Sequence, residues 1–290
     1  MKDIRKFDEL IEDKKRRNEG AFFTPTYWVN KAHEYITNTF GVNWRDEYVV
    51  YDPAWGTGNL TRDYHFKELY CSTLNQSDID TANQNGINNS AVKFQYDFLN
   101  DPYEKLPLKL REHIENGSKI LILMNPPYGA GSSPGIDHKS GIAKTKIHAL
   151  MKKDGDWGAC TAQLFAQFFY RIYKWQGLNK NICIGAYSNS IVLAGVSYKS
   201  FRKRFFKEFQ YKAGFIFGSS EFSGTKDTWA VLFSLWGAGE TADKNNFDAG
   251  VLRIGKVKDV RILYNLGCTY SASDWVREDL KGVTLEETIQ

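Results

Sequence analysis

The sequence predicts an α/β fold, in which helices cover both faces of a mostly parallel sheet. Three observations point to this class. Short apolar runs alternate with helical stretches along most of the chain. A turn containing two glycines, at residues 52–58, directly follows the first of these runs. The run at 119–124 ends in Asn125-Pro126-Pro127-Tyr128, where consecutive prolines stop a strand and cannot enter a helix interior.

The composition fits a globular protein with a sizeable core. The chain has 290 residues, enough for one large α/β domain or for one domain with an appendage. Hydrophobic residues make up 42% and aromatic residues 15%, a surplus that suits base stacking as well as core packing. The formal net charge of +4 allows a nucleic-acid partner but does not require one.

Cysteine usage and the lack of long apolar runs indicate a cytoplasmic setting. The four cysteines form no C-x-x-C pair, so we expect neither a zinc site nor a disulfide framework. The charged first residues are not followed by an apolar segment, and no run reaches the ~20 apolar residues of a membrane span. We therefore expect a cytoplasmic protein whose site holds no metal ion.

The N-terminal region reads as two helices joined by an extended turn. Residues 3–18 are highly charged and predict an exposed helix that Gly20 ends. Thr24 can cap a second helix at 26–39, and Pro25 suits its first position.

Four apolar runs then predict parallel strands, and each is followed by polar or glycine-bearing residues. The runs cover residues 47–51, 69–74, 92–96 and 119–124. The residues after them are Asp52-Pro53-Ala54-Trp55-Gly56-Thr57-Gly58, Asp78-Ile79-Asp80, Asp97-Phe98 and Asn125-Pro126-Pro127-Tyr128. Because ligands of such sheets bind beyond the carboxyl ends of the strands, these segments predict one site.

The second half begins with a long segment that lacks a core pattern. Residues 129–159 are rich in glycine, serine and lysine and predict a loop, whose position just after Tyr128 favours a functional role. The basic residues of a helix at 197–209 form either a solvated face or a phosphate-contacting one. The other predictions are a helix at 161–174, a strand at 181–187, an antiparallel strand pair at 211–217 and 228–236, a linker at 241–248, and two short strands and a helix within 250–290.

Asn125-Pro126-Pro127-Tyr128 suits the capture of a planar group that carries an –NH2. The Asn125 side-chain oxygen and the Pro126 carbonyl can each accept one N–H bond. Tyr128 can stack on the ring. A stiff turn after a buried strand is the plain alternative.

The other motifs suit a nucleoside. Gly56 and Gly58 permit a tight turn and the close approach of a ligand, although an ordinary strand-to-helix turn would also use them. Asp78 can accept both ribose hydroxyls, whereas Asp80 can instead cap a helix. Asp97 can accept from the exocyclic amine of an adenine. Each carboxylate could simply cap a helix, but their order along the chain favours a ligand.

Together these motifs, with Phe23-Thr24-Pro25 ahead of them, resemble the gamma-type amino-methyltransferases of DNA, the adenine-N6 enzymes of restriction-modification systems. The resemblance covers roughly residues 20–236. It implies a Rossmann-like methyltransferase fold, with a seven-stranded, mostly parallel sheet that has one antiparallel strand near an edge. The strand pair at 211–217 and 228–236 matches this expectation.

The resemblance implies S-adenosylmethionine as the cofactor and gives each motif a role. Asn125, Pro126, Pro127 and Tyr128 would grip the target base, and Phe222 would add a second aromatic ring unless it packs in the core. The implied cofactor contacts are Phe23, Thr24 and Pro25 with Asp52, Pro53, Ala54, Gly56 and Gly58 at the methionine end, Asp78 at the ribose, and Ile79, Asp97 and Phe98 at the adenine.

Two departures from the family affect the expected organisation. Trp55 is bulkier than the small residue or cysteine usual there, which predicts a reshaped cofactor pocket. The methyltransferase domain should span 1–240, including the helix at 1–20 and the inserted loop at 129–159. Family members usually carry a longer recognition domain, whereas here the small extension at 241–290 would be a reduced recognition element. Alternatively, a specificity or restriction partner chain, or a missing part of the chain, would supply recognition.

The expected function is transfer of a methyl group to the N6 amino group of an adenine flipped out of duplex DNA. An RNA base or a protein glutamine amide would present the same planar amine, so both remain alternatives. A third is a non-catalytic nucleic-acid-binding or partner subunit, which would not need an intact Asn125 and glycine loop. A dinucleotide-dependent oxidoreductase would not need Asn-Pro-Pro-Tyr.

Overall fold

The computed structural model describes residues 24–129, 145–221, 229–242, 246–253 and 256–264. These residues form a nine-stranded sheet with the order β3-β2-β1-β4-β5-β7-β6-β8-β9. The strands are β1 (Val49–Asp52), β2 (Leu69–Thr73), β3 (Val92–Gln95), β4 (Ile120–Met124), β5 (Ile182–Asn189), β6 (Phe209–Gly218), β7 (Ala230–Ala238), β8 (Asn246–Arg253) and β9 (Lys256–Tyr264).

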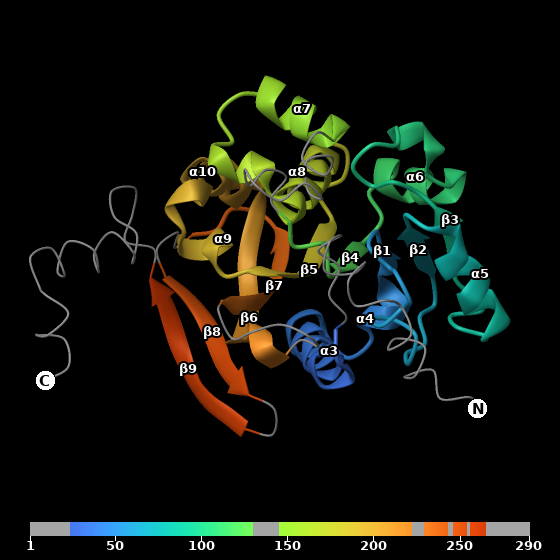
Figure 1. The fold of residues 1–290 in the computed structure, drawn as a ribbon, viewed down its shortest axis with the longest axis horizontal. Helices are drawn as coiled ribbons and strands as arrows, with labels where there is room; N and C mark the ends of the chain where they lie inside the picture. Colours follow the sequence, from blue (N-terminus) through green and yellow to red (C-terminus); the bar gives the residue numbers. More distant parts are fainter. Residues whose placement is uncertain (1–23, 130–144, 222–228, 243–245, 254–255, 265–290) are drawn as a thin grey trace, which may run out of the picture.

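The first seven strands confirm the predicted fold class. β1 to β5 pair in parallel, whereas β7 runs antiparallel to both β5 and β6. This is the expected reversed strand near one edge. Beyond it, β8 pairs in parallel with β6, and β9 pairs antiparallel with β8. The two added strands place a hairpin at the end of the sheet opposite β3 (Figure 1).

Helices cover both faces of the sheet. Figure 1 shows α7, α8 and α10 on one side and α3 on the other. The helices are α3 (Thr26–Phe40), α4 (Trp44–Glu47), α5 (Gln76–Gln84), α6 (Leu108–Glu115), α7 (Lys146–Lys153), α8 (Leu164–Gln176), α9 (Ile191–Ala194) and α10 (Lys199–Glu208). Short 3-10 turns lie at η1 (Tyr103–Lys105), η2 (Ala159–Ala162), η3 (Val196–Tyr198) and η4 (Ser219–Glu221).

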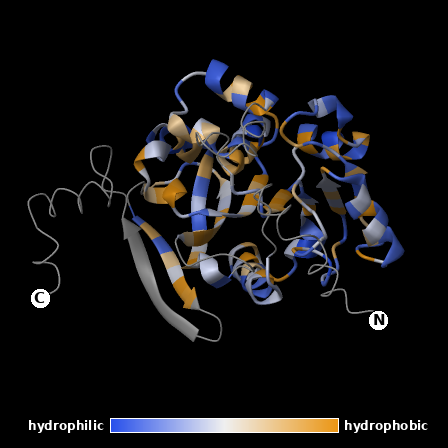
Figure 2. Cartoon of the chain, in the orientation of Figure 1, coloured by the Kyte–Doolittle hydropathy of each residue, from blue (hydrophilic) through white to orange (hydrophobic). Residues whose placement is uncertain are grey.

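The alternation of side chains along the central strands builds one core on each face. In β4, Ile120, Ile122 and Met124 join the core beneath α6, α8 and α10. Leu121 and Leu123 join the core beneath α3 and α4. Because both faces are buried, these strands read as continuous apolar runs. Figure 2 shows hydrophilic and hydrophobic residues mixed along the covering helices, as expected for helices with one buried face.

Two predicted features near the site need correction. Thr24 does not cap α3: Pro25 occupies the N-cap position, and no side chain caps the helix there. The predicted loop at 129–159 contains α7, because the Thr145 side chain accepts a hydrogen bond from the His148 N–H and starts a helix. Ile147 and Met151, four residues apart, then bury one face of that helix.

Other differences concern element boundaries. The helix predicted at 161–174 begins at Leu164, after η2. The short helix α4 and the helix α6 were not predicted. The linker predicted at 241–248 gives way to β8 at Asn246. Because β8 pairs with β6, this part of the predicted extension continues the sheet, and the domain division at residue 240 stays a prediction.

The basic helix α10 is only partly a solvated face. Arg202 is 6% exposed and donates to the Gly195 carbonyl, and Arg204 donates to the Asp154 carbonyl. Lys203 and Lys207 are exposed.

Among the described residues, no helix has the length and hydropathy to cross a membrane. The helix predicted at 3–18, Phe23 and Phe222 lie outside the described residues.

Candidate functional site

The predicted motifs meet at the carboxyl edge of the parallel strands. Asp52 is the last residue of β1, Asp97 follows β3, and Asn125 follows β4. The strand order places β1 and β4 side by side within the parallel part of the sheet, beyond whose carboxyl ends ligands of open α/β sheets bind. Since β7 is antiparallel to β5, β7 begins at this same edge, and Trp229 directly precedes it.

Asn125 is held by Thr24, the first residue that the structure describes. Its Nδ2 donates to the Thr24 Oγ1 at 2.9 Å. Thr24 is 3% exposed, and Asn125 is half-buried. This hydrogen bond turns the amide oxygen of Asn125 away from Thr24. The contact joins the Thr24-Pro25 segment to the Asn-Pro-Pro-Tyr turn, a link across a hundred residues that sequence spacing did not indicate.

Tyr128 lies between two other aromatic side chains. Its ring centroid is 5.0 Å from that of Trp229, with the planes tilted by 46°, and 6.2 Å from that of Phe165. The Gly129 carbonyl accepts from the Leu164 N–H at 2.9 Å, which ties the turn to the start of α8. Burial raises the pKa of the Tyr128 phenol well above its usual range, so the hydroxyl stays neutral. Any contribution of Tyr128 to a site would therefore come from its ring and not from a charged oxygen.

Trp229 is the candidate site residue that the sequence did not reveal. It is half-buried, and its backbone carbonyl accepts from the Ser219 N–H at 3.0 Å, which closes the base of the β6–β7 connection. Its position beside Tyr128 depends on the pairing of β5 with β7. The only sequence signal was its place at the start of a predicted strand.

The glycine turn has the backbone shape that its sequence predicted. Gly56 and Gly58 have φ values of +54° and +82°, which favour glycine. Trp55 is 3% exposed, and its Nε1 donates to the Thr61 Oγ1 at 3.0 Å. A β-carbon at Gly58 would lie 3.1 Å from the Trp55 ring. Trp55 therefore packs beneath the turn, and its effect on a cofactor pocket stays a prediction.

A buried histidine fixes the end of the glycine turn. His33 is 3% exposed, and burial lowers its pKa to about 3. The neutral ring donates from Nε2 to the Leu60 carbonyl at 2.8 Å. Its Nδ1 accepts from the Arg45 guanidinium at 2.9 Å. Helix α3 thereby positions the turn that follows β1.

Asp52, at the end of β1, is a buried carboxyl group. It is 1% exposed, and its Oδ1 accepts from the Ala54 N–H at 3.0 Å. Its Oδ2 is buried, with no hydrogen-bond partner among the described residues. Burial raises the pKa of this carboxyl to about 8. Because a buried carboxylate without a counter-charge is costly, the group is suited to receive a cation.

Asp78 belongs to the helix that follows β2 and not to the end of the strand itself. β2 ends at Thr73, and Asp78 belongs to the first turn of α5. Its Oδ2 accepts from the Thr73 Oγ1 at 2.7 Å, which holds the carboxylate close to the end of β2. Ile79 is only 5% exposed, whereas Leu74 is 60% exposed directly after β2. Of these two apolar side chains, Leu74 is therefore the accessible one and Ile79 the buried one.

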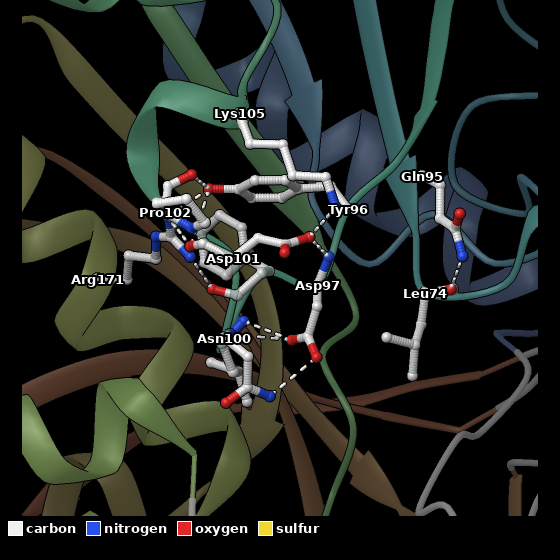
Figure 3. Close-up of polar contacts among 11 residues, drawn as sticks. Leu74, Gln95, Tyr96, Asp97, Asn100, Asp101, Pro102, Lys105 and Arg171 are labelled. Atoms are coloured by element: carbon white, nitrogen blue, oxygen red, sulfur yellow. Dashed lines mark hydrogen bonds and ion pairs between the residues drawn. The ribbon is translucent and has the colours of Figure 1, made fainter.

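Asp97 organises the turn after β3, as Figure 3 shows. Its Oδ1 accepts from the backbone N–H groups of Leu99 and Asn100, and its Oδ2 accepts from the Asn100 side-chain amide at 2.8 Å. The Asp97 N–H in turn donates to the Asp101 carboxylate at 2.8 Å. Asp97 therefore caps this turn, as its plain interpretation expects, and its Oδ2 keeps room for one more donor.

The prediction that Phe98 faces an adenine needs correction. Phe98 is 3% exposed and stacks on Phe168, with ring centroids 4.7 Å apart. Trp175 meets its edge at 5.4 Å. Phe98 is thus part of the core under α8, because the turn points its side chain inward while Asp97 points to the edge.

No family model and no curated protein matches the sequence. The DrdV–DNA complex matches with a TM-score of 0.57 and 16% identity, over 90% of this chain and 32% of that one. A modification subunit of a putative type I restriction enzyme from Vibrio vulnificus matches with a TM-score of 0.54 and 14% identity, over 88% of this chain and 51% of that one.

A putative class I S-adenosylmethionine-dependent methyltransferase from Listeria monocytogenes matches with a TM-score of 0.51 and 11% identity, over 88% of this chain and 71% of that one. At these identities the likeness establishes the fold: the chain has the Rossmann-like methyltransferase fold. It spans about a third of the DrdV chain and half of the Vibrio subunit. The described residues contain no cluster of three or more His, Cys, Asp or Glu side chains suited to a metal ion.

Proposed function

We propose that this chain transfers a methyl group from S-adenosylmethionine to the N6 amino group of an adenine flipped out of DNA. The observation that carries the proposal is the position of Asn125-Pro126-Pro127-Tyr128. It follows the central strand β4, with Asn125 bonded to Thr24 and Tyr128 beside Trp229. This arrangement puts hydrogen-bond acceptors and aromatic rings together beyond the end of β4, and a planar amine needs both for its capture. Fold likeness to DrdV in its DNA complex and to a modification subunit of a putative type I restriction enzyme supports DNA as the substrate.

The residues at the edge fit S-adenosylmethionine. The methionine part of this cofactor carries an ammonium group, and the buried Asp52 carboxyl has an oxygen without a partner among the described residues. The positive φ values of Gly56 and Gly58 let backbone approach the ligand closely. Asp78, in the first turn of α5 and bonded to Thr73, would hold the ribose, and Asp97 would accept from the adenine amine. We retain Phe23, Thr24, Pro25, Pro53 and Ala54 as proposed contacts of the methionine end.

The chain's own groups would position and polarise the reacting amine. When bound, the cofactor supplies a methyl group that its sulfonium has already made electrophilic. The Asn125 Oδ1 and the Pro126 carbonyl would accept the two N–H bonds of the adenine amine. Its nitrogen would then become more tetrahedral and turn its lone pair toward the methyl group. Tyr128 and Trp229 would stack on the flipped base and offset part of the unstacking cost of a few kcal/mol.

A methyl-transfer assay with three acceptors tests the proposal. We expect tritium from labelled S-adenosylmethionine to enter duplex DNA, and not RNA or protein presented at equal concentration. Label in a protein glutamine or in RNA would replace the proposed substrate by one of the alternatives. The absence of cofactor binding in calorimetry would favour a non-catalytic nucleic-acid-binding subunit.

The pH dependence of cofactor binding tests the role of Asp52. The pKa of this carboxyl is raised to about 8, and a neighbouring ammonium group would lower it again. Binding should therefore release a proton below pH 8. The association constant for S-adenosylhomocysteine should rise with pH, up to about tenfold per unit, and level off near pH 8.

Calorimetry in buffers of different ionisation enthalpy measures the proton release directly. Asp52→Asn is the matched control, because its side-chain oxygen can still accept from the Ala54 N–H. That variant should bind more weakly and without proton release. The role given to Asp52 would be contradicted if the affinity of the unaltered protein stayed the same from about pH 6 to about pH 8.

Replacement of Trp229 tests its contribution to base capture. Trp229→Ala should weaken binding of duplex DNA that carries a mismatched target adenine by about tenfold, through the loss of one stacking surface. Trp229→Phe should keep most of the affinity, because an aromatic ring remains beside Tyr128 to stack on the base. Equal affinities of all three proteins would place Trp229 outside the base pocket.

A further inference from the structure

Arg171 is a buried arginine whose hydrogen bonds go to neutral acceptors. It lies in α8 and is 5% exposed. Its Nη1 donates to the Phe98 carbonyl. Its Nη2 donates to the Tyr96 hydroxyl and, at 3.0 Å, to the Asp101 carbonyl. A buried charge needs such partners, and here the turn after β3 supplies all of them.

The contacts of Arg171 enclose one short segment of chain. Its guanidinium also lies 5.1 Å from the Tyr96 ring centroid and 5.0 Å from that of Phe98. The Tyr96 hydroxyl in turn donates to the Pro102 carbonyl at 3.0 Å. Figure 3 shows Arg171 reaching this turn from α8, with Asp97 on the strand side of the same turn. The guanidinium thus fastens residues 96–102 to α8.

The contacts of Asp97 with the other described residues leave one of its acceptor positions unused. Its Oδ1 already accepts two N–H groups, from Leu99 at 2.9 Å and from Asn100 at 3.0 Å. Its Oδ2 accepts, within the part of the chain that the structure describes, only the Asn100 side-chain amide at 2.8 Å. A carboxylate offers about four lone-pair positions, so the remaining one belongs to Oδ2. The direction of this lone pair depends on the conformation of the turn that Arg171 holds.

We propose that Arg171 is a positioning residue that sets the preference of the site for the adenine of its cofactor, by fixing the turn from which Asp97 accepts the 6-amino group. The inference rests on the proposed function. Helix α8 then serves both halves of the site. Its first turn holds the Tyr128 turn through Leu164 and Phe165, and Arg171, two turns later, holds the Asp97 turn.

Two cofactor products that differ at a single position test this role. S-adenosylhomocysteine has a 6-amino group, whereas S-inosylhomocysteine has a 6-oxo group that repels the Asp97 oxygen. The unaltered protein should bind the adenosyl form more tightly in calorimetry. Arg171→Lys removes the planar fork of donors and should reduce this preference about tenfold. In turnover, the KM for S-adenosylmethionine should rise while kcat stays near its original value.

Arg202 is a matched control. It is buried to the same degree, at 6% exposed, and also donates to backbone carbonyls, those of Gly195 and Val192. Arg202→Lys should lower the melting temperature as Arg171→Lys does, yet keep the preference for the adenosyl form. If Arg171→Lys does not fold, Tyr96→Phe carries the test, because it removes the hydroxyl that accepts from Arg171.

The outcomes separate the inference from the function beneath it. A folded Arg171→Lys or Tyr96→Phe variant that keeps the full preference overturns the positioning role while leaving the methyltransferase proposal intact. If the unaltered protein binds both compounds equally, Asp97 does not read the amine and the inference fails. If it binds neither, the proposed function itself fails, and the inference with it.

Discussion

Replacement of Asn125 with alanine is expected to abolish detectable methyl transfer, a loss of about a thousandfold or more. The adenine amine is a weak nucleophile, because its lone pair is delocalised into the ring. Without the Asn125 oxygen, only the Pro126 carbonyl would remain to draw the nitrogen toward a tetrahedral shape. Binding of S-adenosylhomocysteine should survive, since Asn125 contacts the target base in this proposal. Single-turnover transfer and calorimetry on the same preparation measure both effects.

Asn189 provides the control for this substitution. It ends the neighbouring strand β5 at the same edge of the sheet, and its side chain accepts from the Ile191 N–H at 3.0 Å. Asn189→Ala should keep its activity, because this contact only begins α9. Normal turnover in Asn125→Ala would remove Asn125 from the reaction, and equal losses in both variants would indicate general damage to the edge.

Replacement of Tyr128 with alanine is expected to weaken capture of the flipped base. Stacking on an aromatic ring contributes about 1–3 kcal/mol per base, so affinity for DNA with a mismatched target adenine should fall roughly 5- to 150-fold. 2-Aminopurine at the target position fluoresces when it leaves the stack. Its fluorescence increase on binding should shrink in this variant, while cofactor affinity stays the same.

Tyr128→Phe separates the ring from the hydroxyl. The hydroxyl is buried, and burial raises the pKa of the phenol well above its usual range, so it offers no charge to the reaction. Tyr128→Phe should therefore retain the fluorescence increase. A Tyr128→Ala protein with an undiminished increase would show that another residue holds the base.

The sequence predicted the sheet well because its signals are local. Each central strand is buried on both faces and reads as an apolar run. The double proline after Met124 and the positive φ values of Gly56 and Gly58 follow from residue type alone. The helix α7 also left a signal in Thr145, Ile147 and Met151, which the surrounding glycines and lysines concealed.

The parts of the site that the sequence did not predict depend on tertiary contacts. Thr24 bonds to Asn125 across the fold, and Trp229 reaches Tyr128 only through the pairing of β5 with β7. Phe98 was predicted at the ligand because it follows Asp97. The residue types of a turn do not reveal which of its side chains faces the core. The buried Arg171 looked like any polar residue of an amphipathic helix.

The identity of the methylated nucleoside tests the central claim most directly. Duplex DNA treated with the chain and isotope-labelled S-adenosylmethionine can be digested to nucleosides and analysed by mass spectrometry. We predict label in N6-methyl-2′-deoxyadenosine, and none after treatment with Asn125→Ala. Label in a cytosine derivative, or the same yield of methyladenine from the Asn125→Ala protein, would contradict the account of an adenine amine held by Asn125 and Pro126.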